Sequence, residues 1–352
     1  MSSDFWRNKK VFITGHTGFK GTWLSLWLQS LGANVGGFAL AMPTTPNMFS
    51  LLRLEKSMES HIGDVREFVL IHKVMNNFKP DVVFHLAAQP LVRYSYQHPV
   101  DTYSTNVMGT VHVLEVAKTC DSVKVVVNIT TDKCYENKEW CWGYREHEPL
   151  GGFDPYSNSK ACSELVTSAY RNSFYQQKNI GLASARAGNV IGGGDWSQDR
   201  LIADVMKSMM TNKTAVIRNP NAIRPWQYVL EPLQGYLLLA EELFSKPRQF
   251  SGAWNFGPYT HESISVESVV KKIFCAWTQK NTDWIVQHNP EDLHEAHFLK
   301  LDISKAVTQL HWKPKLNIDA AIEWTVNWYQ ACMRKVDMHQ FSLEQITKYE
   351  TL

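Results

Sequence analysis

A glycine-rich turn near the N-terminus constrains the fold of this chain more than any other feature. The turn, Thr14–Gly21, follows the short apolar run Val11–Thr14 and leads into a helical pattern that stops at Gly32. Its glycines follow a G-x-x-G-x-x-G spacing. Glycines between a strand and a helix let a pyrophosphate approach backbone N–H groups at the positive end of the helix. The turn therefore predicts a Rossmann-type unit that binds a dinucleotide.

Apolar strands alternate with helical patterns after this turn. The further predicted strands are Val35–Leu40, a strand ending near Asp64, Asp81–Ala87, Val123–Thr130 and Gly181–Ala187. The helices between them are predicted at Arg66–Phe78, Val100–Lys118 and Pro155–Gln177. Alternation at this spacing predicts an α/β fold with a doubly wound parallel sheet.

The pattern changes beyond Gly192, where short strands mix with helices. Strands are predicted at Ala215–Arg218, Trp226–Val229 and Ala253–Phe256, and helices at about Arg200–Thr211, Pro232–Ser245, Val266–Thr278 and Ile318–Lys335. We therefore expect a Rossmann domain over residues 1–190 and a smaller, mixed α/β substrate domain over residues 191–352. Some segments of the second part are expected to return to the first.

Composition narrows the setting in which the protein works. The formal net charge is +2 and no run of Lys or Arg occurs, so neither nucleic acid nor an anionic membrane is an expected partner. No apolar stretch is long enough to cross a bilayer. Six scattered cysteines do not make a disulfide framework, and no metal-ligand spacing is present. We expect a cytoplasmic protein without a metal site.

The turn and the strand ends supply the expected cofactor contacts. The residues expected from the turn are Gly15, His16, Thr17, Gly18, Phe19, Lys20 and Gly21. His16 places a bulky ring where small residues are easier to accommodate, which is expected to weaken cofactor binding. The second strand ends Phe38-Ala39-Leu40, with no acidic residue for a ribose and no Arg for a 2′-phosphate, so NAD is only preferred over NADP. Asp64, followed by Val65, is placed to accept from the adenine amino group or to cap the next helix.

Tyr156 and Lys160 lie four residues apart near the start of a predicted helix. This spacing places both side chains on one helix face. A free phenol has a pKa of about 10, and a nearby ammonium favours its ionised form. The pair can then take a proton from an alcohol while hydride leaves the same carbon. Thr130 and Thr131 end the preceding strand, and Thr131 is expected to donate to the same hydroxyl or to share the proton path.

These features resemble the extended short-chain dehydrogenase/reductase superfamily. The matching segments are the glycine turn, His85-Leu86-Ala87-Ala88 after the fourth strand, Asn106 in the long helix and the Tyr156/Lys160 pair. The resemblance covers most of the chain and implies NAD as the cofactor. It assigns Leu86, Ala87 and Ala88 to the nicotinamide half of the site, beside Thr130, Tyr156 and Lys160. It also implies a homodimer or homotetramer that pairs through the helices near Val100–Lys118 and Pro155–Gln177.

The segment Thr131-Asp132-Lys133 resembles the nucleoside-diphosphohexose 4,6-dehydratases within that superfamily. There, C4 is oxidised, a base removes the C5 proton, an acid helps the 6-hydroxyl to leave as water, and hydride returns to C6. Those enzymes have Asp-Glu after the Thr, whereas this chain keeps the acid as Asp132 and has Lys133 at the base position. Lys133 could act as a base in its neutral form, or stabilise an enolate while water or another residue takes the proton. An exposed ion pair of Asp132 with Lys133 is the alternative without a catalytic role.

The departure at Lys133 also narrows the expected substrate. Together with Ile223-Arg224-Pro225-Trp226-Gln227 and the segment 188–196, it resembles the dehydratases that act on CDP-glucose. This implies CDP-glucose as substrate, CDP-4-keto-6-deoxyglucose as product, and a place in deoxysugar and lipopolysaccharide O-antigen biosynthesis. Arg224 is expected to bind the nucleotide phosphates, because a guanidinium binds phosphate in a bidentate way. Further candidates for substrate contacts are Asn189, Arg200 and Arg218, although Arg200 could equally be a solvated surface side chain.

Two other functions fit parts of the pattern. One is a nucleotide-sugar 4-epimerase or reductase of the same superfamily, and Asp132 distinguishes it because an epimerase has no 6-hydroxyl to expel. The other is a catalytically silent NAD-binding regulator, against which the intact Thr131, Tyr156 and Lys160 argue.

Overall fold

The computed structural model describes residues 3–42, 44–259, 264–277, 283–287 and 298–352. A seven-stranded sheet forms its centre, in the spatial order β11-β6-β5-β4-β1-β2-β3. All neighbouring strands in this sheet run parallel. The strands are β1 (Lys10–Thr14), β2 (Asn34–Ala39), β3 (Glu59–Ile62), β4 (Val82–His85), β5 (Val125–Ile129), β6 (Gly181–Ala187) and β11 (Gly252–Phe256). The predicted doubly wound parallel sheet is confirmed.

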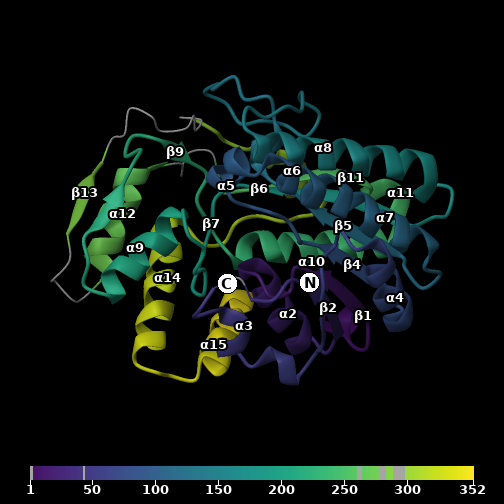
Figure 1. Cartoon of the computed structure of the whole chain (residues 1–352), viewed down its shortest axis with the longest axis horizontal. Coiled ribbons are helices and arrows are strands. Elements are labelled where there is room, and N and C mark those ends of the chain that lie inside the picture. The colour runs from purple at the N-terminus through teal and green to yellow at the C-terminus, as the bar shows by residue number, and fades with distance from the viewer. Residues whose placement is uncertain (1–2, 43, 260–263, 278–282, 288–297) are drawn as a thin grey trace.

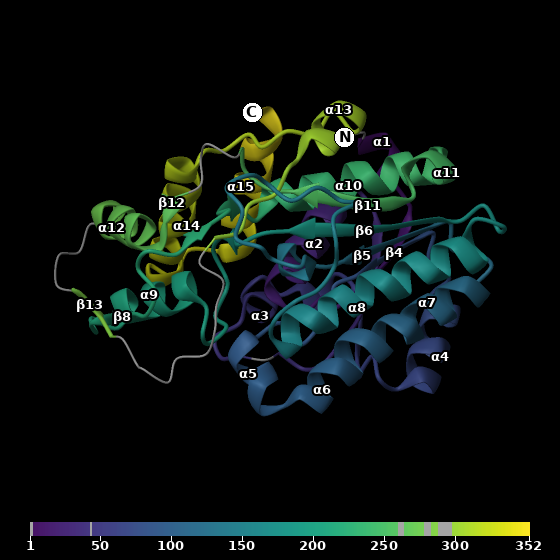
Figure 2. The ribbon, with the colours of Figure 1, turned by 90° about the horizontal axis from the view of Figure 1, so that it is seen from above.

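Helices cover both faces of the sheet (Figure 2). One face carries α4 (Phe68–Phe78), α7 (Gly109–Thr119) and α8 (Pro155–Tyr170). The other carries α1 (Ser3–Trp6), α2 (Phe19–Ser30) and α10 (Leu230–Ser245). Because both faces are covered, the central strands are buried along their whole length, as in β5 and β6.

The predicted helix Val100–Lys118 consists of three consecutive segments. They are α6 (Pro99–Tyr103), a π-helical turn η2 (Ser104–Met108) and α7. Asn106 in the π-helical turn is buried, and its amide nitrogen donates to the Gln89 carbonyl at 3.0 Å and to the Ser159 hydroxyl at 2.9 Å. Single π turns inside helices are frequent at functional sites. Here the turn ties the loop after β4 to helix α8.

Three small two-stranded sheets and several helices lie beside one end of the central sheet (Figure 1). The short strands are β7 (Val190–Ile191), β8 (Ala215–Ile217), β9 (Ile223–Arg224), β10 (Gln227–Tyr228), β12 (Ile264–Ser265) and β13 (Trp284–Val286). The helices of the second half besides α10 are α9 (Leu201–Met210), α11 (Pro247–Phe250), α12 (Val266–Ala276), α13 (Ser304–Gln309), α14 (Ile318–Met333) and α15 (Met338–Thr351).

Several elements differ from the expectations. The segment Ala253–Phe256, predicted within the mixed second half, forms β11 and joins the central sheet beside β6. Helix α5 (Val92–Gln97) was not predicted, nor was α15. The connection between β2 and β3, for which no element was predicted above, contains α3 (Met48–Leu51) and a short 3₁₀ turn, η1 (Leu54–Lys56). The domain boundary at residue 190 stays a prediction, because one continuous apolar core joins both halves.

Candidate active site

The glycine turn between β1 and α2 leaves no room for side chains at two of its glycines. Gly15 has φ +79°, a left-handed backbone that glycine adopts without strain. A Cβ at Gly21 would lie 2.1 Å from the Gly15 carbonyl oxygen, so the first turn of α2 packs directly on the loop. A Cβ at Gly15 would lie 2.8 Å from the Ala87 nitrogen. This close packing is what a pyrophosphate-binding turn requires, and the residues fit a dinucleotide.

His16 turns its ring into the protein. The ring is fully buried, and a Cβ on Gly37 of β2 would lie 2.4 Å from its Cγ atom. Its Nε2 atom lies 2.7 Å from the Ser60 hydroxyl of β3. Burial and the charge of His61 lower the pKa of His16 to about 4. The ring is thus neutral near pH 7 and packs against the sheet, while the expected weakening of cofactor binding stays a prediction.

The other predicted cofactor residues lie at the carboxyl ends of β3 and β4. The Asp64 carboxylate accepts a hydrogen bond from the Arg66 backbone nitrogen at 2.9 Å and forms an ion pair with its guanidinium. Asp64 thus stabilises the turn before α4, but it does not cap that helix, whose N-cap residue is Glu67. Val65 is buried, and Leu86 and Ala87 follow β4, where their backbone nitrogens donate to the carbonyl and the hydroxyl of Thr14 at 3.0 and 3.2 Å. These bonds hold the end of β4 against the glycine turn.

Thr131, Asp132 and Lys133 form a tight structure directly after β5. Thr131 begins a short 3₁₀ turn, η3 (Asp132–Cys134), and its hydroxyl donates to the Asp132 carboxylate at 2.9 Å. Asp132 is only 2% exposed, and its Oδ2 atom has no hydrogen-bond partner among the described residues. Burial raises the pKa of Asp132, while Lys133, Thr131 and Arg224 oppose this shift. Asp132 is thus a buried carboxyl group that holds its proton more tightly than usual, and not an exposed ion pair.

Tyr156 and Lys160 both lie on α8 beside this turn, and both are buried. The Lys160 ammonium donates to the Ile129 carbonyl at 3.2 Å, and burial lowers the pKa of Lys160 to about 8. Burial raises the pKa of Tyr156 to about 12, and a hydrogen bond with Thr131 and the charge of Arg200 lower it. The spacing of Tyr156 and Lys160 predicts that the Lys160 ammonium lowers the pKa of Tyr156. In this structure, Thr131 and Arg200 are the groups that lower this pKa most.

Lys20, in the first turn of α2, lies in the same cavity as Tyr156. Its ammonium makes no hydrogen bond to a described residue, and it lies 6.0 Å from the centre of the Tyr236 ring. Burial, together with the charges of Lys160 and Arg200, lowers the pKa of Lys20 to about 7, and Asp132 opposes this. A half-buried ammonium at this position makes the cavity attractive for anionic groups when it is protonated.

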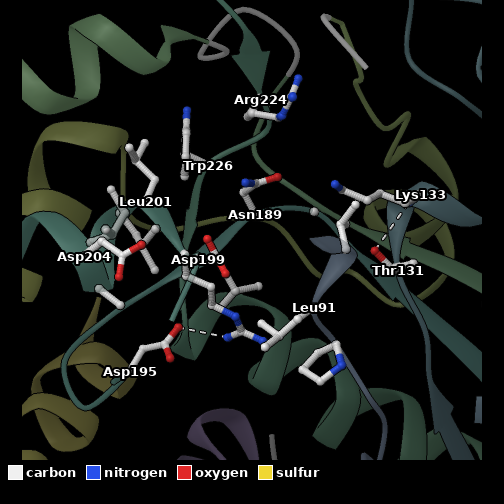
Figure 3. A pocket seen from close by; sticks show the side chains of 18 of the residues that line it. Leu91, Thr131, Lys133, Asn189, Asp195, Asp199, Leu201, Asp204, Arg224 and Trp226 are labelled. Atoms are coloured by element: carbon white, nitrogen blue, oxygen red, sulfur yellow. Dashed lines mark hydrogen bonds and ion pairs between the residues drawn. The ribbon is translucent and has the colours of Figure 1, made fainter. Parts of the chain in front are cut away.

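One cavity of about 280 Å³ joins the turn, the catalytic segment and the second half of the chain. It is lined by Phe19, Lys20, Thr130, Thr131, Asp132, Lys133, Tyr156, Asn189, Arg200, Arg218 and Arg224, among others. In Figure 3, Thr131 and Lys133 lie on one side of the cavity, with Asn189 and Arg224 above the centre. A second cavity of about 570 Å³ adjoins it and shares Lys133 and Arg224.

The predicted substrate residues all reach the first cavity, but their surroundings differ. Arg224 is 6% exposed, and it donates to the Ile223 carbonyl at 3.1 Å. Arg200 forms an ion pair with Asp195 at 2.9 Å, and Arg218 forms one with Asp199 at 3.1 Å. Arg200 is thus neither a simple surface side chain nor an uncompensated cation.

Sequence reasoning missed two features of the site. One is Asp204, which lines the cavity from the first turn of α9. The other is the buried ion pair of Glu164 with Arg186, whose Glu164 carboxylate accepts from Thr130, the neighbour of Thr131. Glu164 stands four residues after Lys160 and so shares its helix face, which was the available signal.

No group of described residues has the composition of a metal site. Within the described ranges, no helix has the length and apolar character needed to cross a membrane.

A parallel sheet with a glycine turn after β1, and a Tyr and Lys on α8 beside the end of β5, defines an extended short-chain dehydrogenase/reductase. Within that class, the chain belongs to the GDP-mannose 4,6 dehydratase family, whose model matches residues 12–325. The family resemblance seen in the sequence is confirmed.

Individual relatives agree with this assignment. The chain is 53% identical to the CDP-glucose 4,6-dehydratase of Salmonella typhimurium over 99% of this chain and 98% of that protein. It is 25% identical to the dTDP-glucose 4,6-dehydratase of Haemophilus influenzae over 91% of this chain and 97% of that protein.

Solved structures show the same fold at lower identity. The dTDP-glucose 4,6-dehydratase of Bacillus anthracis in complex with NAD has a TM-score of 0.74 at 21% identity, over 93% of this chain and 98% of that one. The UDP-glucose 4-epimerase of Thermotoga maritima with UDP-glucose has a TM-score of 0.78 at 19% identity, over 92% of this chain and 99% of that one.

Proposed function

We propose that this chain is an NAD-dependent CDP-glucose 4,6-dehydratase, which converts CDP-glucose to CDP-4-keto-6-deoxyglucose and water. The observation that carries the proposal is the position of Asp132, a buried carboxyl group with a raised pKa, hydrogen-bonded to Thr131 in the Tyr156 cavity. An epimerase has no leaving hydroxyl for such an acid to protonate. The 53% identity to a CDP-glucose 4,6-dehydratase supports the same choice.

The glycine turn and the carboxyl ends of β1 and β4 would hold the cofactor. Bound NAD supplies a reversible hydride acceptor for a sugar carbon. The backbone of Gly15 and Gly18 and the start of α2 would receive the pyrophosphate. Leu86 and Ala87, beside Thr14, would support the nicotinamide half. The half-buried Lys20, when protonated, adds a positive charge to this end of the cavity.

Tyr156 is the proposed base for the C4 hydroxyl. Its raised pKa means that it ionises only when neighbouring groups stabilise the phenolate. A hydrogen bond with Thr131 and the positive charge of Arg200 both lower this pKa. The Lys160 ammonium lies on the same helix face and completes the cationic surroundings.

Asp132 is the proposed acid that protonates the 6-hydroxyl as it leaves. A carboxyl group with a raised pKa retains a proton for transfer at a pH where a solvated Asp would be ionised. Lys133, which is half-buried on the cavity wall, is placed to remove the C5 proton in its neutral form or to stabilise the enolate. Arg224 is the proposed phosphate contact.

The test of this proposal separates oxidation from water loss. The purified chain is incubated with CDP-glucose and NAD, and the 4-keto product is followed by its alkaline absorbance. Asp132→Asn should abolish product while retaining exchange of the C4 hydrogen, and Thr131→Val serves as a variant that impairs oxidation first. If the wild-type chain turns over another nucleotide sugar but not CDP-glucose, the proposed substrate is wrong. If Asp132→Asn loses both product and exchange, Asp132 is structural.

We also propose that the chain pairs with itself as a homodimer, or as a homotetramer built from such pairs. Apolar side chains are exposed on the outer surface of α6, α8 and the adjoining turns, among them Val100 at 82%, Leu165 at 58% and Met108 at 46%. These helices form one outer layer in Figure 2. Exposed apolar patches of this kind mark protein interfaces.

The scattered free cysteines support a cytoplasmic location.

A further inference from the structure

Asp204 presents a carboxylate to the cavity without a partner. It lies in the first turn of α9 and is half-buried. Among the described residues, none donates a hydrogen bond to this carboxylate or forms an ion pair with it. The carboxylate is therefore available to accept a hydrogen bond from a ligand in the cavity.

The surroundings of Asp204 suit a flat aromatic ligand. Apolar side chains line this end of the cavity, including Leu201, Val216 and Trp226. Val216 on β8 is 46% exposed, so its side chain is accessible to a ligand. Such surfaces bury the faces of a nucleobase, and a few polar groups then read its edge.

The layout of the cavity decides which part of a nucleotide sugar reaches Asp204. Figure 3 shows Asp204 and Leu201 on the side opposite to Thr131 and Lys133, with Asn189 and Arg224 between them. If the proposed function holds, the hexose lies beside Thr131 and the phosphates lie near Arg224. The base then lies at the far end, beside Asp204.

We infer that Asp204 is the residue that selects cytosine over uracil and thymine. Cytosine carries an amino group at C4, which donates to a carboxylate. Uracil and thymine carry a carbonyl oxygen at the same position, so a carboxylate would meet a second acceptor there. Discrimination therefore comes from attraction to the correct base and repulsion of the wrong one.

The selectivity requires that Asp204 is ionised. Burial and the neighbouring Asp199 raise the pKa of Asp204 to about 6, while Arg218 and Lys207 lower it and Asp195 raises it further. Near pH 7 the carboxyl group is still mostly ionised, so it acts as an acceptor for the C4 amino group of cytosine and cannot donate to the O4 atom of uracil. In the alternative interpretation, Asp204 only stabilises the positive end of α9.

The experiment measures equilibrium binding of CDP and UDP by calorimetry, without turnover. The wild-type chain should prefer CDP on the order of tenfold to a hundredfold, which is the scale of one specific contact to a base edge. Asp204→Asn should reduce this preference to less than about threefold, because an amide can pair with either base. Asp204→Leu should reduce the preference to a similar extent, because it weakens the binding of CDP. In wild type, N4,N4-dimethyl-CDP should bind as weakly as CDP binds to Asp204→Leu.

Asp199→Asn is the matched control, since it removes a neighbouring carboxylate from the same cavity but leaves Asp204. It should change the affinity for both nucleotides and keep their ratio. The inference is overturned if the CDP preference survives in both Asp204 variants, or if Asp199→Asn lowers the preference equally. Failure of the proposed function is separate, because it would show as absence of 4-keto product from CDP-glucose. The methylated ligand requires no variant, so a misfolded protein cannot hide the answer.

Discussion

Removal of the Arg186 guanidinium should strongly destabilise the protein and reverse part of its pH dependence. Arg186 on β6 binds the Glu164 carboxylate in a bidentate way, with two N–O distances of 2.9 Å, and both side chains are only 3% exposed. The guanidinium also donates to the Tyr135 hydroxyl at 2.8 Å and to the Glu146 carbonyl at 3.0 Å. Removing one partner of a buried pair leaves a buried charge uncompensated, which costs about 3–5 kcal/mol. We expect Arg186→Met to lose about 4 kcal/mol of the free energy of unfolding.

The pH dependence follows from Glu164. Burial raises the pKa of Glu164, but Arg186, Ser184 and Thr130 together lower it below its ordinary value. In the wild type, ionised Glu164 thus stabilises the folded state at pH values above its unfolded-state pKa. This stabilisation is lost as the pH falls through the lower folded-state pKa. In Arg186→Met the effect of burial dominates and the folded-state pKa lies above the unfolded one. The native state of the variant then binds more protons than the unfolded state, so its free energy of unfolding falls as the pH rises. The loss of stability relative to the wild type should therefore be larger at pH 8 than at pH 5.

The measurement is urea-induced unfolding at both pH values, followed by tryptophan fluorescence. Arg145→Met is the matched control, because the Arg145 side chain is 63% exposed and its ion pair with Asp302 should contribute at most about 1 kcal/mol. The double variant Arg186→Met/Glu164→Leu should regain most of the loss, since no unpaired charge remains. A deficit of Arg186→Met that equals that of the control, or that is the same at both pH values, would refute the reasoning.

Two further predictions concern the glycine turn and the outer helices. Gly21→Ala should weaken NAD binding at least tenfold by fluorescence titration, because its Cβ would lie 2.1 Å from the Gly15 carbonyl oxygen; unchanged affinity would show that the turn does not cradle the cofactor. Leu165→Asp should convert the assembly to a monomer in analytical ultracentrifugation, since Leu165 is 58% exposed on α8; a monomeric wild type, or an unaltered variant, would contradict the proposed pairing.

The fold was predictable where one local signal dominates. β6 has the bounds expected for Gly181–Ala187, because this segment follows a helical pattern and, apart from Ser184 and Arg186, has the small and apolar residues of a strand buried on both faces. Helix α15 gave no such signal. Its stability comes from distant contacts, such as the Tyr349 ring against Trp27 at 5.8 Å and the Tyr349 hydroxyl bonded to Glu231 at 2.7 Å. Contacts of this kind have no local pattern in the sequence.

The site was predictable to the extent that its residues lie at the ends of predicted strands. Thr131 and Tyr156 meet because β5 ends beside the first turn of α8, and the sequence order of the two elements indicates this. Asp204 was not predictable, since an Asp in the first turn of a helix is common on any surface. Only the folded chain shows that this turn faces the cavity and that Asp199 lies close to it.

The place of β11 has a consequence for the order in which the chain folds during synthesis. β11 pairs with β6 from Gly252↔Ala183 to Phe256↔Ala187, so the edge of β6 has no backbone partner there until residue 256 has left the ribosome. A nascent chain ending near residue 190 would therefore expose the unpaired backbone edge of β6, and such edges are prone to aggregation. Pairing across about seventy residues also raises the contact order and slows folding. The first half of the chain should consequently depend on the second half, or on a chaperone, to reach a stable state.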